Sequence, residues 1–320
     1  LGLSMEDGVK AADERVVSIP YLGVSRGRNE SLLLSSRGVS YSQQSNEVAA
    51  WCGPLLQDGD SRKSGMQIYH RREWDPEVGK RIGSESVEKA AELLKASPIS
   101  GGKLPVVLDE FIAPRFLGMF FGAFSAESAQ RGMSRLQGRL GETIAIPELT
   151  LLDDPHRQGA NRSCFLDAEG FLTKPLPLIE NGVFRNFLYN VESANKENKS
   201  STGHAVRSYS GGISTRSHNL VWPTGELNLE QLCAQNSKCL LVTQLEGQAG
   251  CNPVSGDISI GVQGFLIENG RRIQPVDSIT LAGNFFDVLL NIRGSGNTYQ
   301  PELTHSFIPA LLIEGLSVSG

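Results

Sequence analysis

Glycine recurs at short intervals along the chain, and its placement restricts the folds that this chain can adopt. The sequence holds 35 Gly among 320 residues, above the usual share of about 7%, whereas charged residues make up only 20%. Several glycines separate runs of β-branched and apolar residues, as at Asn181-Gly182, a pair typical of a type I′ hairpin turn. This pattern predicts an α+β fold of mostly antiparallel sheets with flanking helices.

The composition excludes several classes of protein. A hydrophobic share of 39% indicates a globular protein rather than a disordered or fibrous one. The net charge of −5 leaves no excess of Lys and Arg to neutralise a phosphate backbone, so we expect no direct nucleic-acid binding. The longest apolar run, residues 111–124, is interrupted by Pro114 and Arg115 and is too short to cross a bilayer, so we expect no membrane span.

The cysteines and the N-terminus indicate the cellular setting. The 5 Cys are odd in number and have no CxxC spacing, which favours a reducing, cytoplasmic location over a disulfide framework. The chain begins at Leu1 without an initiator Met, and its first residues lack the basic and apolar regions of a signal peptide. We interpret the chain as starting inside a longer gene product.

The length predicts two domains. In the first, β-rich runs at 16–24, 30–36 and 39–51 precede a helix capped by Asp75-Pro76, and Ser97-Pro98 with the following glycines marks the boundary. In the second, we expect a buried strand at 103–111, an apolar core helix at 113–132 and a short helix capped by Thr224. LIENG occurs at Leu178–Gly182 and again at Leu266–Gly270, which favours recurring hairpin turns over an internal duplication.

No catalytic motif stands out from the residues themselves. The five His, at positions 70, 156, 204, 218 and 305, form no HExxH pair, and the sequence has neither a GxSxG elbow nor a phosphate loop. Cys251 lies in a Gly-rich turn, where a small buried thiol is favoured over a nucleophile. Asp153-Asp154-Pro155 favours a turn whose side chains cap backbone N–H groups over a cation site.

Several segments, taken in order, resemble the TldD/PmbA family, also called modulators of DNA gyrase, and within it the PmbA/TldE branch. The segments are LPVVLDEFIAPRFLGMF, ELTLLDDP, FLDAEGFLTKPLPLIENGVFRNFLYN, SANKENKSSTGHAVR, CNPVSGDISIGVQGFLIENG, TLAGNF and PALLIEGLSVSG. They span most of 103–320. The resemblance implies that residues 101–320 form the family's C-terminal metallopeptidase-like domain and that residues 1–100 form the end of its N-terminal domain, truncated at its start.

The resemblance also concerns a metal site. In the catalytic TldD branch, the helix after the VVL strand holds an HExxxH motif, and a Cys near the C-terminus completes the ligand set. Here that helix reads Arg115-Phe116-Leu117-Gly118-Met119-Phe120, and Thr304–Phe307 holds no Cys. The resemblance therefore implies no metal and no cofactor in this chain, with zinc expected in a TldD-like partner.

The implied function is that of a PmbA/TldE-like subunit of a metallopeptidase complex that processes or degrades unfolded peptides. The implied partner is a TldD-like subunit or a second copy of this chain. Two segments are expected to line the peptide cleft, and their residues are Ser201, Thr202, Gly203, His204 and Arg207, then Asn252, Ser255, Gly256 and Asp257. Two alternatives stay open: a free-standing peptidase that uses an unrecognised site such as Cys251 with His204, and a binding protein that modulates DNA gyrase.

Overall fold

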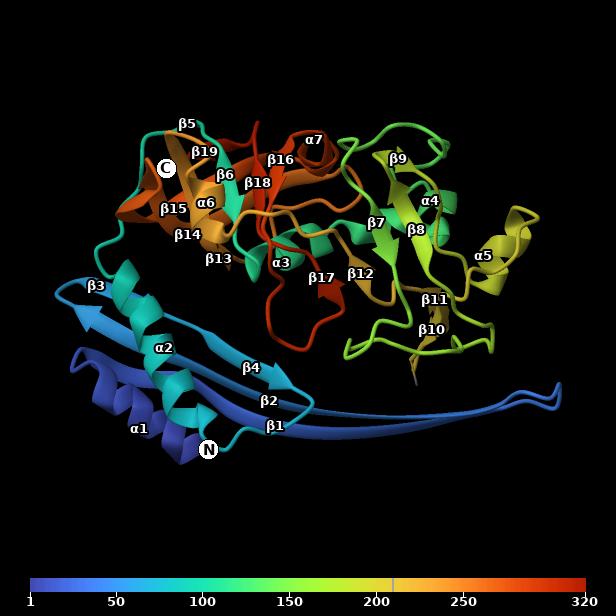
Figure 1. Ribbon diagram of the computed structural model, residues 1–320, viewed down its shortest axis with the longest axis horizontal. Helices are drawn as coiled ribbons and strands as arrows, with labels where there is room; N and C mark the ends of the chain where they lie inside the picture. Colours follow the sequence, from blue (N-terminus) through green and yellow to red (C-terminus); the bar gives the residue numbers. More distant parts are fainter. Residues whose placement is uncertain (209) are drawn as a thin grey trace.

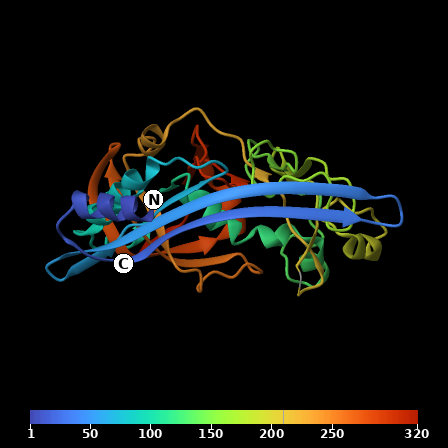
Figure 2. The ribbon, with the colours of Figure 1, turned by 90° about the horizontal axis from the view of Figure 1, so that it is seen from below.

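A long antiparallel hairpin dominates the first hundred residues of the computed structural model, which describes residues 1–208 and 210–320. Its arms are β1 (Val16–Leu34) and β2 (Ser40–Asp58), and the hairpin runs beneath the rest of the molecule in Figure 1 and along its length in Figure 2. The two β-rich runs expected at 16–24 and 30–36 are therefore parts of one strand. The strand continues through Gly27 because this residue pairs with Glu47 of the other arm.

Two helices cover the base of this hairpin on one face. α1 (Gly2–Ala12) and α2 (Val78–Leu93) pack against each other and against β2, while β3 (Ser61–Ser64) and β4 (Gln67–Arg71) extend the sheet. The helices approach closely because a Cβ at Gly83 would lie 2.2 Å from the carbonyl oxygen of Met5. The expected cap is wrong, since α2 begins at Val78 and the Asp75 side chain instead accepts from the backbone N–H of Glu77.

The rest of the chain is organised around an eight-stranded, mostly antiparallel sheet. Only β6 and β13 pair in parallel within it. In spatial order its strands are β16 (Ile292–Ser295), β18 (Leu311–Ile313), β6 (Val106–Leu108), β13 (Lys238–Glu246), β14 (Asp257–Glu268), β15 (Arg271–Asn284), β19 (Ser317–Ser319) and β5 (Gly102–Lys103).

A second, five-stranded sheet lies beside the first (Figure 1). In order its strands are β17 (Ser306–Phe307), β12 (Leu220–Val221), β7 (Leu151–Asp153), β8 (Leu176–Glu180) and β9 (Val183–Phe184). A separate pair, β10 (Ala205–Arg207) and β11 (Ile213–Thr215), follows α5 (Val191–Lys196). Two further short helices are α6 (Leu229–Cys233) and α7 (Phe285–Leu290); α6 is capped by Asn228 and not, as expected, by Thr224.

Both LIENG segments form hairpin turns with the predicted backbone. Asn181 and Gly182 have φ of 49° and 78° between β8 and β9, and Asn269 and Gly270 have 50° and 75° between β14 and β15. Two consecutive positive φ values define a type I′ turn, and Asn and Gly tolerate them best. The sequence expectation for these turns is confirmed.

The apolar helix expected at 113–132 is interrupted. It consists of α3 (Ile112–Gly118), a 3₁₀ turn (Phe121–Phe124, η1) and α4 (Ala126–Gln130). The break occurs because Ser125 is extended, with φ −77° and ψ 129°, and on either side of it the Phe124 carbonyl oxygen and the Ala126 N–H bond to the backbone of Leu188. The expectation of burial is correct, since most of α3 lies in the core.

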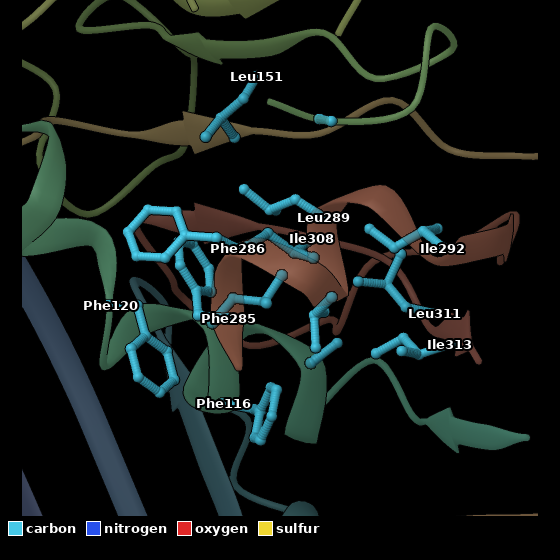
Figure 3. Packing of buried hydrophobic residues seen from close by; sticks show 14 of the residues in the cluster. Phe116, Phe120, Leu151, Phe285, Phe286, Leu289, Ile292, Ile308, Leu311 and Ile313 are labelled. Carbon is cyan, nitrogen blue, oxygen red and sulfur yellow. The ribbon is translucent and has the colours of Figure 1, made fainter. Parts of the chain in front are cut away.

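The main core lies where the two sheets and α3 meet (Figure 3). The observed architecture is thus α+β, with mostly antiparallel sheets and flanking helices, as the glycine pattern predicts. Within the described residues, no helix has the length and apolar character needed to cross a membrane.

Candidate functional site

α3 occupies the position at which the family resemblance places a metal motif. The buried strand β6 leads into it, and the Asp109 carboxylate accepts from the backbone N–H groups of Phe111 (2.9 Å) and Ile112 (2.8 Å). Burial is the main cause that raises the pKa of Asp109 to about 7, against these two hydrogen bonds. Residues 106–109 therefore hold the start of this helix in place.

The side chains of α3 and the residues that follow it form an aromatic core. Phe116 and Phe120 are fully buried, and their ring centroids lie 6.2 Å apart. Phe120 also stacks on Phe285 of α7 with a centroid distance of 4.9 Å and an interplanar angle of 14° (Figure 3). Arg115, at the remaining motif position, is exposed, and its guanidinium has no acceptor atom to offer a metal ion.

These residues do not fit a zinc ion. Zinc in proteins is held by Cys sulfur, His nitrogen or carboxylate oxygen, and the three positions of the motif offer none of them. Across residues 1–208 and 210–320, no group of three or more His, Cys, Asp and Glu side chains is arranged to hold a metal ion. A zinc ion would therefore find no ligand among the side chains at these three positions.

The first predicted segment, residues 201–207, is a scaffold loop over most of its length. Thr202 accepts from the backbone N–H of Tyr189 (2.8 Å), and Ser201 donates to the Tyr189 carbonyl oxygen (3.2 Å). Gly203 has a φ of +76°, and a Cβ there would lie 2.9 Å from the carbonyl oxygen of Leu172. Arg207 alone in this predicted set is exposed.

His204 joins a buried network that sequence reasoning missed. Its ring is 1% exposed; Nε2 donates to Asp153 Oδ2 (3.0 Å), and Nδ1 lies 2.8 Å from the Thr202 hydroxyl. The backbone N–H of His218 donates to the same Asp153 oxygen (2.9 Å), and the two imidazole centroids lie 4.8 Å apart. Asp153 therefore does not cap a turn as expected, although Asp154 does, since it accepts from His156 N–H (2.9 Å).

His218 also faces a thiol. Its Nε2 donates to the Gly203 carbonyl oxygen (2.8 Å), which leaves Nδ1 to accept from the Cys164 thiol (3.4 Å). Burial lowers the pKa of His218, and burial, followed by the nearby carboxylates, raises the pKa of the Cys164 thiol to about 11. A neutral thiol is a poor nucleophile, so this pair is a structural contact rather than a catalytic dyad.

The second predicted segment, Asn252–Asp257, is a self-bonded turn. Asn252 Oδ1 accepts from the backbone N–H of Val254 (2.9 Å), and the Ser255 hydroxyl donates to Asp257 (2.5 Å). Gly256 has a φ of +80° and is buried, whereas Asn252 and Asp257 are exposed. Cys251 before it is half-buried and packs against the main core, so the expected burial of this thiol is met only in part.

The structure holds the two predicted segments separately. Asn284 donates to Asp257 (3.1 Å) in the second, whereas the first is bound to Tyr189 and Asp153. In the part of the chain that the structure describes, no hydrogen bond joins the two segments. Hydrogen bonds therefore do not join the nine predicted residues into one cluster.

A surface hollow of about 490 Å³ lies elsewhere, on the long hairpin. It opens between the hairpin and the segment that follows β4, and both apolar and charged residues line it. The lining residues are Val24, Arg26, Asn46, Val48, Arg72, Glu73 and Trp74. Sequence reasoning did not identify this hollow, because it depends on the register that sets Val24 opposite Ala50 and Arg26 opposite Val48.

Comparisons with known proteins cover both parts of the chain. The PmbA/TldA metallopeptidase C-terminal domain matches residues 101–320, and the central domain of the same family matches residues 1–94. A metalloprotease PmbA homolog from Haemophilus influenzae is 29% identical, covering 100% of this chain and 69% of the relative. Metalloprotease PmbA from Escherichia coli O157:H7 is 32% identical, covering 77% of this chain and 52% of the relative.

Two solved structures have the same fold. A protein from Thermotoga maritima, suggested to be a modulator of a DNA gyrase, superposes with a TM-score of 0.89 at 30% identity, covering 99% of this chain and 74% of that one. TldE from Thermococcus kodakarensis gives a TM-score of 0.86, covering 99% of this chain and 73% of that one, and at 24% identity it supports the fold alone.

Proposed function

Since the chain belongs to the PmbA/TldD family of metallopeptidase-like proteins, we propose that it is the metal-free, PmbA/TldE-like subunit of a peptidase assembly. In this proposal a TldD-like subunit supplies zinc and the bond-breaking chemistry. The present chain supplies part of the cleft that admits an unfolded peptide. The observation that carries the proposal is the aromatic packing of Phe116 and Phe120, at the helical positions where the catalytic branch holds its metal motif.

The packing supports this role because a metal site could form here only if buried aromatic rings were replaced. Phe120 lies flat on Phe285 within the main core, so a ligand side chain at this position would exchange buried apolar contacts for a polar group. α3 thus contributes to the core but presents no metal ligand at these positions. We therefore place the reaction on the partner.

We propose that the exposed residues of the two segments, 201–207 and 252–257, contact the peptide. Arg207, Asn252 and Asp257 are exposed, whereas Gly203, His204 and Gly256 are buried and would act by holding the loops in place. An extended peptide would add its backbone to a strand edge of the sheets, with β5 and β16 as the outer strands of the larger one.

The domain assignment, the location and the partner follow from the same proposal. We place residues 1–100 in the end of an N-terminal domain and residues 101–320 in the metallopeptidase-like domain, in a cytoplasmic protein. The partner is a TldD-like subunit or, in its absence, a second copy of this chain, because closed two-fold pairing is the commonest assembly.

The alternative of a peptidase based on Cys251 and His204 has less support. Both ring nitrogens of His204 already face Asp153 and Thr202, so this imidazole has no nitrogen left to activate a thiol. The acidic net charge of −5 likewise gives no support to a direct action on DNA.

Co-expression with a TldD-like subunit tests the proposal. We expect each protein alone to leave an unstructured fluorogenic peptide intact, the pair to cleave it, and zinc to co-purify at one ion per pair. The control is the pair in which the partner's motif histidines are replaced by Ala. Stoichiometric zinc and chelator-sensitive cleavage by this chain alone would refute the proposal.

A further inference from the structure

Two arginines and a histidine from three separate segments meet beside the buried Asp153. The backbone N–H of Asn161 donates to the Thr304 carbonyl oxygen (2.9 Å), which sets Arg162 next to His305. We refer to Arg162, Arg216 and His305 together as the Arg162 cluster.

Further hydrogen bonds bring in the segment that carries Arg216. Arg162 N–H donates to Asn219 Oδ1 (3.0 Å), and its Nη1 donates to the Ser217 carbonyl oxygen (3.4 Å). The backbone N–H of Leu220 donates to the His305 carbonyl oxygen (2.9 Å), where β12 pairs with β17. The three segments are thus fixed to one another by two backbone hydrogen bonds and by the side chains of Asn219 and Arg162.

Positive charge exceeds negative charge at this place. The carboxylate beside Arg162 and His305 is that of Asp153, whose Oδ2 already accepts from His204 and from the His218 N–H. Within residues 1–208 and 210–320, neither arginine forms an ion pair with a carboxylate. Two guanidinium groups against one carboxylate leave a net charge of about +1.

The partial burial of Arg162 and His305 makes the excess charge unfavourable. Burial and the neighbouring Arg216 lower the pKa of Arg162 to about 10. Burial, followed by Arg162 and Arg216, lowers the pKa of His305 to about 4, so this ring is neutral near pH 7. Like charges in a half-buried place are stabilised when an anion joins them.

We propose that the Arg162 cluster binds a carboxylate group of an extended peptide, either its free C-terminus or an acidic side chain. The planar guanidinium fork matches a carboxylate with two parallel hydrogen bonds. One net positive charge suits a monoanion better than a dianion such as phosphate. Arg216 is exposed and leaves the site open to solvent, while Arg162 and His305 are half-buried. The peptidic nature of the ligand rests on the proposed function.

The test uses the isolated full chain and fluorescein-labelled unstructured peptides in anisotropy titrations. Three peptides of one sequence are compared: a free C-terminal acid, its amide, and an amide with one internal Glu. We expect the acid or the Glu peptide to bind about tenfold more tightly than the neutral amide. The acid and Glu arms identify which carboxylate is recognised.

Substitutions locate the effect. Arg216→Gln should abolish the preference without affecting the fold, because this side chain is exposed, and Arg216→Lys should retain part of it. The matched control is Arg131→Gln, an exposed arginine at the end of α4, which should leave the preference unchanged. An independent readout is the pKa of His305 by NMR, which should rise when the acidic peptide is bound, because a nearby anion favours imidazolium.

Equal binding of acid and amide, an unchanged preference in Arg216→Gln, or an unmoved pKa of His305 would overturn the subsite. Tighter competition by inorganic phosphate than by acetate would overturn the monoanion assignment. Binding by the isolated chain is measured without any partner, so failure of the pair to cleave peptide refutes the proposed function while this result can still stand.

Discussion

Replacing Phe120 by Ala tests the conclusion that aromatic packing fills the position of the metal motif. The ring of Phe120 is fully buried, stacks on Phe285 at 4.9 Å and meets Phe116 edge to face at 6.2 Å. Removing it therefore destabilises the fold in two ways: the free energy gained by burying the phenyl group is lost, and a cavity is left in the core.

The magnitude follows from these contacts. Phe→Ala substitutions in cores cost about 3–5 kcal/mol. The two aromatic pairs account for about 0.5–1.5 kcal/mol each within that sum. Because a folded domain is stable by about 5–15 kcal/mol, the variant should lose a large share of its stability.

Urea unfolding followed by tryptophan fluorescence measures this loss, since one of the three Trp, Trp222, is buried in the same core cluster. The control is Phe165→Ala, whose side chain is 62% exposed and should cost about 1 kcal/mol or less. A loss below about 1 kcal/mol in Phe120→Ala would refute the reasoning, because it would show that the α3 aromatic residues can be dispensed with and that a polar ligand set could replace them.

Three further predictions concern ionisable groups. Because burial raises the pKa of Asp109 to about 7, the free energy of unfolding should fall as pH rises from about 4 to about 7. Asp109→Asn keeps the helix cap, so its urea midpoint, plotted against pH, should change less over this range. The lowered pKa of His305 has the opposite sign, so stability is lost as pH falls from about 6.5 to about 4, and His305→Gln should reduce that loss; an unchanged acid limb would contradict it. A disulfide reagent should modify Cys251, which is partly exposed, first in the native chain. Cys164 should react slowly, because its thiol has a pKa of about 11. Mass mapping should find the three buried thiols unmodified, which are Cys52, Cys233 and Cys239.

Local chemistry explains which elements were predictable. The Asn181-Gly182 and Asn269-Gly270 turns follow from the tolerance of Asn and Gly for positive φ, a preference that neighbouring segments do not change. The apolar character of residues 112–124 likewise fixes their burial. Their division into α3, a 3₁₀ turn and α4 was not predictable, because the break depends on hydrogen bonds to Leu188, more than 60 residues away in the sequence.

The glycine pattern and the apolar spacing thus determined by themselves that this chain is an α+β protein of hairpins, and the residue types of Arg115, Phe116 and Phe120 determined that these three positions offer no zinc ligand. The meeting of Asp153 with His204 and His218, and of Arg162 with Arg216 and His305, was decided only by the tertiary structure. The physical reason is that turn geometry and burial are set by neighbours in the chain. A charge cluster instead depends on strand register between segments such as β12 and β17, which no local preference encodes.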